Sequence, residues 1–271
     1  MRSNAIYLTL LMMCVEPALG DISYIPISED IKINTGDFGI GCDMEETHIS
    51  RAGKDIFIAT GGINISIPID IVGEDADVIV GDMSGNGHCD LAVPYGKSDV
   101  NESYTLFVYD IPHEKFKKSN AGIISNPDFK ENKIISSYRD AAQWHEDYFC
   151  YSKSLVDFFL CSQKKSIDNS LEWLRLCSED LCASSTIIYK ASSIQASAVV
   201  TADRAKLHDI TNGNILKERK GYLVKGDKVM LIDFLQTYED AYYKVNYFNN
   251  KMITTGWVKG AQLVVNPVTE K

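Results

Sequence analysis

Apolar residues occur along this chain in short runs, and Gly, Asn, Asp, Ser and Pro separate the runs. In several runs, such as residues 106–109, successive side chains are expected to point alternately to two faces. This arrangement is typical of β-strands. Helical periodicity is weak, and residues 171–176, the best helical candidate, are equally compatible with a strand. Regularly spaced short strands predict an all-β fold, as an antiparallel β-sandwich or a propeller-like domain. The runs lie at residues 56–59, 63–71, 78–80, 104–109, 134–135, 148–151, 155–160 and 187–189.

A stretch of small residues at 191–197 predicts a linker between two domains, 21–190 and 198–271. The second domain has five or six short apolar runs of its own. The residues 225–228 form a strong turn signal between two of these runs, and Trp257 follows Gly256 at the start of another. We expect this domain to be a small closed β-barrel.

One segment of the first domain has the composition of a calcium loop. It reads D-x-S-x-N-G-x-x-D, with side-chain oxygens from Asp82, Ser84, Asn86 and Asp90 and a main-chain carbonyl from His88. Calcium prefers six to eight oxygen ligands, and a tight loop can aim alternate oxygens at one point. Because apolar strand-like runs flank the segment, it joins strand to strand, unlike an EF-hand. A polar turn that binds nothing has the same composition, and serine is the weakest of these ligands.

The first twenty residues predict an export signal. Arg2 precedes an apolar core at residues 6–15, and residues 18–20 fit a small-x-small cleavage site. The core is too short to span a bilayer, and Met12 and Met13 make Cys14 a poor lipidation site. Six cysteines remain after cleavage, an even number that predicts disulfides in an exported protein. Their pairing is open, although Cys177 and Cys182 flank a short polar loop and are the easiest two to join.

Charge is distributed unevenly between the two domains. Residues 21–197 hold 15 Lys and Arg against 28 Asp and Glu, whereas residues 198–271 hold 11 against 8. An acidic surface repels nucleic acid and steers cationic partners, although it also serves solubility alone. The chain lacks the common hydrolase and phosphate-binding motifs, and its five histidines are scattered. We therefore expect a protein that is not an enzyme, does not bind nucleic acid and has no membrane span.

The second domain resembles the bacterial SH3 domain over most of residues 198–265. The resemblance rests on residues 222–227, on residues 243–245 and on Gly256-Trp257-Val258. Members of that family often bind peptidoglycan or act as docking modules. The resemblance implies a groove near Tyr242, Tyr243, Tyr247 and Trp257. A barrel this small also needs aromatic residues for its core, and a core position is the alternative role of Trp257.

Residues 75–165 are similar to a family of exported calcium-loop proteins, whose loop pattern also recurs in FG-GAP repeats. The similarity rests on residues 81–91, 107–110, 125–129, 135–142 and 148–160. Its best-understood members are immunity proteins that neutralise lysozyme-like peptidoglycan hydrolases, and they are akin in fold to periplasmic lysozyme inhibitors. The chain departs from the family at Asp140, where members usually have a small residue after the arginine.

The resemblance implies an exported, periplasmic inhibitor or immunity protein that binds a lysozyme-like hydrolase. We expect Ser137, Tyr138, Arg139 and Trp144 to form the contact segment, with Arg139 facing a catalytic carboxylate of the partner. Calcium would hold the neighbouring loops in register. The alternatives that need no partner are an intramolecular ion pair for Arg139 and a core or rim position for Trp144. The alternative function is a cell-envelope module that binds peptidoglycan through the SH3-like domain.

Overall fold

The structure, a computed structural model, describes residues 22–27, 30–130, 132–141, 143–211, 215–249 and 252–267. It confirms the all-β expectation. Strands make up 65% of the chain. The helices among the described residues are one short α-helix, α1 (Ile69–Val72), and three single turns of 3-10 helix, η1 (Asp37–Gly39), η2 (Ile111–His113) and η3 (Gly260–Gln262). The ambiguous residues Leu171–Leu176 form a strand, and the predicted export signal lies outside the described residues.

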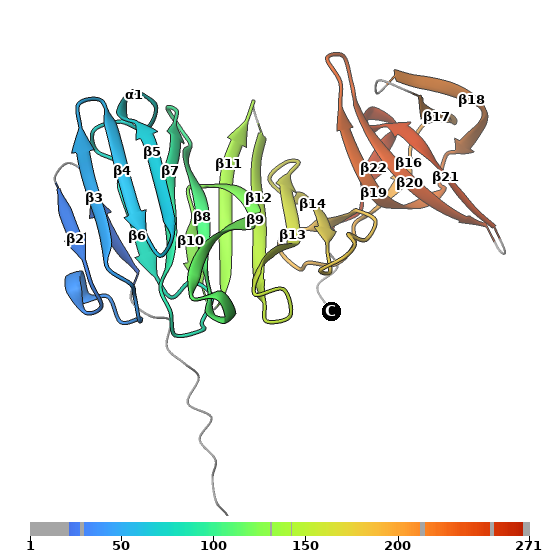
Figure 1. Cartoon of the computed structure of the whole chain (residues 1–271). Helices are drawn as coiled ribbons and strands as arrows, with labels where there is room; N and C mark the ends of the chain where they lie inside the picture. Colours follow the sequence, from blue (N-terminus) through green and yellow to red (C-terminus); the bar gives the residue numbers. More distant parts are fainter. Residues whose placement is uncertain are drawn as a thin grey trace, which may run out of the picture.

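Three antiparallel sheets form the first two thirds of the chain (Figure 1). The four-stranded sheet has the order β2 (Ile31–Ile33), β3 (Thr47–Ala52), β4 (Asp55–Thr60), β5 (Ile63–Pro68). The five-stranded sheet has the order β1 (Ser23–Pro26), β6 (Asp77–Gly81), β7 (Asp90–Lys97), β8 (Glu102–Asp110), β9 (Lys115–Ser125). The six-stranded sheet runs in chain order through β10 (Asp128–Lys130), β11 (Lys133–Asp140), β12 (Gln143–Ser152), β13 (Asp157–Ser166), β14 (Leu171–Leu176) and β15 (Thr186–Tyr189).

The five-stranded sheet is the middle layer, because both of its faces are buried. Val80 and Leu91 pack with residues of the four-stranded sheet in one hydrophobic cluster. Ile79 and Leu106 point the other way and pack with Phe149 of the six-stranded sheet in a second cluster. A strand that is buried on both faces has no polar alternation, which explains the continuous apolar run at residues 78–80. The structure therefore stacks three sheets, where a sandwich has two.

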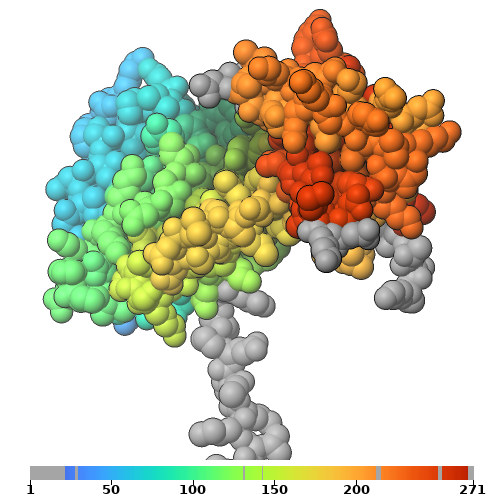
Figure 2. Space-filling view, turned by 90° about the vertical axis from the view of Figure 1, so that its right-hand side faces the viewer, coloured from blue at the N-terminus to red at the C-terminus, as the bar shows by residue number. Residues whose placement is uncertain are grey.

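The remaining strands form one seven-stranded antiparallel sheet, with the order β18-β17-β21-β20-β19-β16-β22. Its core cluster contains Leu171 and Ile187 of the six-stranded sheet together with Leu231 and Val245 of its own strands. The Trp173 indole Nε1 donates a hydrogen bond to Asp233, at 2.7 Å. The two predicted domains therefore share a hydrophobic core, and Figure 2 shows them in contact. The strands are β16 (Ser197–Val200), β17 (Arg204–Thr211), β18 (Ile215–Val224), β19 (Lys228–Gln236), β20 (Ala241–Asn249), β21 (Met252–Lys259) and β22 (Leu263–Val265).

The predicted linker, residues 191–197, is a turn that leads into β16, and one of its residues is packed in the core. Ala196 is fully buried, and its amide donates to the Ile187 carbonyl while its carbonyl accepts from the Leu231 amide. Three disulfides cross-link the fold, Cys42–Cys89, Cys150–Cys161 and Cys177–Cys182. The third is the pair that the sequence favoured. Three disulfides are consistent with an exported protein.

Candidate functional site

The predicted calcium loop joins β6 to β7, so it connects strand to strand as expected. The Asp82 carboxylate accepts hydrogen bonds from the backbone amides of Asn86 and Gly87, both at 2.9 Å. The Asn86 side-chain oxygen accepts from the His88 amide at 2.8 Å. Gly87 has a φ of 89°, a left-handed conformation that glycine adopts at little cost and that turns the chain back toward Asp90. The loop thus has a fixed shape that its own polar groups maintain.

Asp90 is fully buried at the end of the loop. One carboxylate oxygen accepts from the Ser84 amide at 2.8 Å and the other from the Tyr109 amide at 3.0 Å. Burial raises the pKa of Asp90 to about 7, with a smaller contribution from the negative charge of Asp82. A buried carboxylate whose hydrogen-bond donors are all neutral is costly in free energy. Binding of either a proton or a cation would neutralise the Asp90 charge and lower this cost.

The candidate metal ligands of the loop are all oxygen atoms. Oxygen ligands suit a hard cation such as calcium better than a transition metal. The buried Ser84 hydroxyl lies 3.5 Å from the nearer Asp82 oxygen. Each carboxylate oxygen can accept more than one hydrogen bond or metal bond, so the amide contacts leave lone pairs available. Among the described residues, no group of three or more His, Cys, Asp or Glu side chains is arranged to hold a metal. A calcium site here would combine two carboxylates with neutral oxygens.

Three further contacts hold the carboxyl end of the loop. The Cys42–Cys89 disulfide attaches it to the segment after β2, and the Asp43 amide donates to the Gly87 carbonyl at 3.0 Å. The His88 ring stacks on Tyr109, with ring centroids 4.8 Å apart. The His88 side chain is thus used in packing, which leaves only its carbonyl for the predicted ligand role.

The predicted contact segment forms the β11–β12 hairpin. Arg139 and Trp144 are register partners near its end, and both are exposed, Trp144 at 49%. Register partners point to the same face of a sheet, so these two side chains form one surface. Tyr138 points to the opposite face, where it stacks on His145 with ring centroids 5.0 Å apart. Ser137 is half-buried opposite Glu146.

Tyr138 therefore does not share a surface with its neighbour Arg139. Its hydroxyl donates to Asp147 at 3.3 Å, and burial together with the nearby carboxylate raises its pKa to about 12. Ser137, Arg139 and Trp144 lie on one face of the hairpin, and of these three Arg139 and Trp144 are exposed. Arg139 makes no carboxylate ion pair among the described residues; its Nε donates instead to the Ala141 carbonyl at 3.1 Å.

Two asparagines hold the outer edge of β11, where the short strand β10 no longer covers it. Asn101 accepts from the Arg139 amide at 3.0 Å and donates to the Arg139 carbonyl at 3.1 Å. Asn126 donates to the Ser137 carbonyl at 2.8 Å and accepts from the Glu102 amide at 2.9 Å. These side chains take the place of a neighbouring strand and join the hairpin to the turn before β8. Sequence reasoning missed both, since asparagine in a turn is common and gives no sign of its distant partner.

The calcium loop lies at the other end of the same strands. A Cβ on Gly85 would overlap the side chain of Asn132, which precedes β11, and the Asn132 carbonyl accepts from the Tyr151 amide of β12. The eight residues of β11 place the hairpin end roughly 20–25 Å from there. The contacts that hold the hairpin end directly therefore come from Asn101 and Asn126, and the predicted calcium loop lies at the far end of the strands.

The four aromatic residues of the predicted SH3-like groove are mainly interior. Tyr242 and Trp257 are each 8% exposed, and Tyr243 and Tyr247 pack against the core cluster. The alternative core role considered for Trp257 fits its burial. Tyr242 alone also lines an open depression of about 320 Å³, beside the fully exposed Tyr238.

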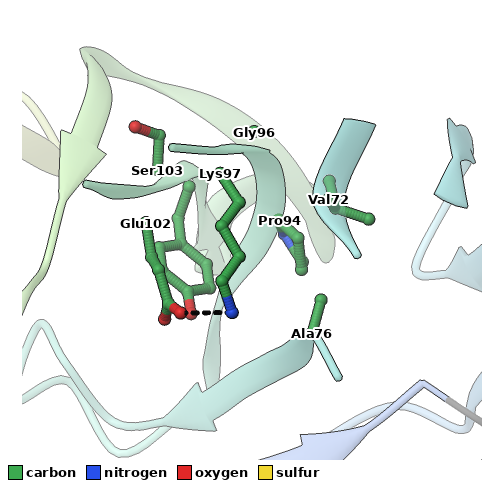
Figure 3. Close-up of a pocket in the computed structure, with 8 residues that line it drawn as sticks. Val72, Ala76, Pro94, Gly96, Lys97, Glu102 and Ser103 are labelled. Carbon is green, nitrogen blue, oxygen red and sulfur yellow. Dashed lines mark ion pairs between the residues drawn. The ribbon is translucent and has the colours of Figure 1, made fainter. Parts of the chain in front are cut away.

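Figure 3 shows another, smaller hollow, between α1, the end of β7 and the start of β8. Lys97 crosses it and forms ion pairs with Glu102 at 2.8 Å and Asp75 at 3.0 Å. These carboxylates raise the pKa of Lys97, which stays charged. The free volume is about 10 Å³, close to the room that one water needs, so this hollow does not hold a substrate.

Comparisons with known proteins gave no match: no family model, no curated protein and no solved structure matches this chain. Within the described residues, no helix has the length and the apolar character needed to cross a membrane.

Proposed function

We propose that this chain is an exported, periplasmic inhibitor or immunity protein that binds a lysozyme-like peptidoglycan hydrolase through the end of the β11–β12 hairpin. The observation that carries the proposal is the exposed pair Arg139 and Trp144 on a hairpin whose backbone the Asn101 side chain holds at two points. The protein does not catalyse a reaction in this proposal. It acts by occupying the cleft of an enzyme.

The pair has the chemistry of an interface anchor. Tryptophan and arginine are enriched among residues that carry most of the binding energy at protein interfaces. Lysozyme-like hydrolases act with acidic residues in a cleft, and the Arg139 guanidinium suits a carboxylate there because it can donate two parallel hydrogen bonds. Because Arg139 forms no carboxylate ion pair among the described residues, binding would not have to break one.

A rigid hairpin binds more tightly than a mobile one, because less conformational freedom is lost on association. The Asn101 and Asn126 contacts supply this rigidity at Arg139 and Ser137. The formal net charge of −10 would speed the capture of a basic hydrolase.

Calcium enters the proposal as a structural cofactor of the β6–β7 loop. Asp82, Ser84, Asn86, Asp90 and the His88 carbonyl would hold it, and it would neutralise the buried Asp90 carboxylate. In this proposal the ion stabilises the fold rather than the recognition surface. The resemblances to calcium-loop immunity proteins and to the bacterial SH3 barrel belong to the same proposal.

An inhibition assay tests the function. Wild-type protein should inhibit at least one member of a panel of lysozyme-like hydrolases that includes any encoded beside its gene. Trp144→Ala should weaken inhibition by roughly a hundredfold or more, as expected for an anchor residue. Tyr238→Ala is the matched control, because it removes an aromatic side chain that is fully exposed in the turn between β19 and β20. Absence of inhibition across the panel, or a larger effect of Tyr238→Ala, would overturn the proposal.

The depression beside Tyr238 and Tyr242 favours a second candidate, a cell-envelope protein that binds peptidoglycan. An exposed aromatic ring next to a hollow suits stacking against a sugar or a peptide. Sedimentation with purified sacculi separates the two candidates. Retention that Tyr238→Ala abolishes and Trp144→Ala leaves intact would favour peptidoglycan binding.

A further inference from the structure

The four-stranded sheet leaves part of the middle layer uncovered. Val93, Thr105 and Ile123 are register partners on β7, β8 and β9, and they form a row across the face that the four-stranded sheet covers. Their exposed fraction rises along this row, from 2% at Val93 to 8% at Thr105 and 46% at Ile123. In the next row, Phe107 is 8% exposed and its partner Lys118 is exposed. The four-stranded sheet therefore covers this face of the five-stranded sheet only as far as β8, and this part of β9 is exposed to solvent.

The strand that borders this opening is β5, the edge strand of the four-stranded sheet (Figure 1). Among the described residues, β5 pairs with β4 alone, in a register without a bulge. Natural proteins usually protect an edge strand with charged residues, a bulge or proline. The residues Ile63–Pro68 carry no charge, and the one proline stands at their end. This edge is able to pair with another strand.

A groove runs between the β5 edge and the open face. It has a volume of about 300 Å³, the lower end of the range of ligand pockets, roughly 300–1,000 Å³. Before the start of β5, the Phe116 amide of β9 donates to the Gly61 carbonyl and joins the two sheets. The lining of the groove is mainly apolar and includes Ile65, Ile67, Val93, Tyr95, Phe107 and Lys118.

Lys118 gives the groove a charge preference. The ion pairs of the described residues do not include Lys118. An ammonium beside an apolar surface favours a carboxylate partner, because the local environment weakens competition from water. An occupant should therefore place an acidic group opposite Lys118.

We infer that the β5 edge accepts an extended segment of a partner protein as an added strand. The segment would pair its backbone with β5, place alternate apolar side chains in the groove and direct a carboxylate at Lys118. Strand addition of this kind takes affinity from backbone hydrogen bonds and specificity from side-chain pockets. The site is separate from the Arg139 and Trp144 pair, so a partner could be bound there independently of the hairpin.

A second copy of this chain suits the groove less well than a foreign segment. In a two-fold pairing of two β5 edges, each groove would receive residues Ile63–Pro68 of the other copy. Those residues contain no carboxylate, so both Lys118 side chains would remain without an acidic partner. Charge thus favours a partner strand that contains an aspartate, a glutamate or a terminal carboxylate.

Selection from a phage-displayed library of random peptides on the full chain tests this inference. We expect enriched peptides to contain alternating apolar residues and one acidic residue. Lys118→Glu should weaken their binding roughly tenfold or more, as expected for the loss of a charged hydrogen bond. Replacing the acidic residue of the peptide with lysine should restore binding to the Lys118→Glu protein. Lys115→Glu is the matched control, because it reverses an exposed charge on the same strand that does not line the groove.

N-methylation of alternate peptide amides separates strand addition from simple occupation of the groove. Methylation along one edge of the peptide should abolish binding, because it removes the donors that face β5. Failure to enrich such peptides would overturn the inference, and so would binding that survives both Lys118→Glu and methylation. A wild-type dimer that Ile65→Lys disrupts would also overturn it, in favour of self-association. Trp144→Ala should leave peptide binding unchanged, so failure of this inference is distinguishable from failure of the hairpin proposal.

Discussion

The hydrogen bonds between Asn101 and the hairpin predict how fast the Arg139 amide exchanges with deuterium. Testing this requires no knowledge of the binding partner. Asn101→Ala removes both hydrogen bonds with the Arg139 backbone, the one that the Arg139 amide donates at 3.0 Å and the one that its carbonyl accepts at 3.1 Å. Beyond Ile135, no strand among the described residues pairs with β11 on that side, since β10 pairs with Lys133, Ile134 and Ile135. The Arg139 amide would then have water as its partner, and the hairpin end would open more often.

The size of the effect follows from the two bonds. A neutral hydrogen bond contributes about 0.5–1.5 kcal/mol net, and Asn101 is half-exposed, so the pair contributes about 1–2 kcal/mol to the local closing of the hairpin. Since a difference of about 1.4 kcal/mol corresponds to a factor of ten, the Arg139 amide should exchange with deuterium roughly 5 to 30 times faster in the variant.

Amide exchange measured by NMR resolves this single position. Asn120→Ala is the matched control, since the exposed Asn120 side chain forms no hydrogen bond with the described residues. Exchange at Arg139 that is unchanged in Asn101→Ala would refute the reasoning. An equal increase throughout the six-stranded sheet would also refute it, because it would show that Asn101 supports the whole fold. If the hairpin is the recognition site, the same variant should weaken inhibition by a similar factor without removing any contact residue.

Further predictions concern the calcium loop, the disulfides and one histidine. Calcium in excess over chelator should raise the melting temperature of wild-type protein and leave Asp82→Asn unchanged; an equal shift in both proteins would contradict the proposed site. Gly85→Ala should cost about 1–2 kcal/mol of unfolding free energy in a denaturant titration, because its φ of 69° disfavours a side chain; the control Gly41→Ala, with open space for a Cβ and no positive φ, should cost less. Removing Cys42–Cys89, which closes a loop of 47 residues, should cost about 4 kcal/mol, against about 2 kcal/mol for Cys177–Cys182, which closes 5; equal losses would contradict the loop-entropy argument. Burial, and to a smaller extent Lys165, lower the pKa of His145, so the unfolded chain binds the proton more readily than the folded chain does. The free energy of unfolding should therefore decrease as the pH decreases through the unfolded value of 6.5. This decrease should be smaller in His145→Gln.

The sequence predicted the fold class and most strand positions because local patterns decide them. A short apolar run such as residues 106–109 favours a strand whatever sheet it later packs against. The stacking of three sheets is not a local property. Ile79 and Val80 look alike in the sequence, and only the structure shows that they enter different cores. The shared core around Leu171 and Ile187 was hidden for the same reason, since a run of small residues predicts a linker without revealing what packs against it.

The candidate site was predictable where it depends on neighbours in the chain. The loop at residues 82–90 makes its own hydrogen bonds, so its composition was informative. Strand alternation should have separated Tyr138 from Arg139, because adjacent residues of a strand face opposite sides. The contact between Asn101 and Arg139 joins residues 38 positions apart, and no local pattern encodes it.

The central claim is that a hydrolase binds the end of the β11–β12 hairpin, and an amide-exchange footprint of the complex tests it most directly. With a lysozyme-like hydrolase that the protein inhibits, we predict that slowed exchange concentrates in residues 137–141 and 143–146. Protection confined to the seven-stranded sheet, or no change at the hairpin under saturating hydrolase, would contradict the claim.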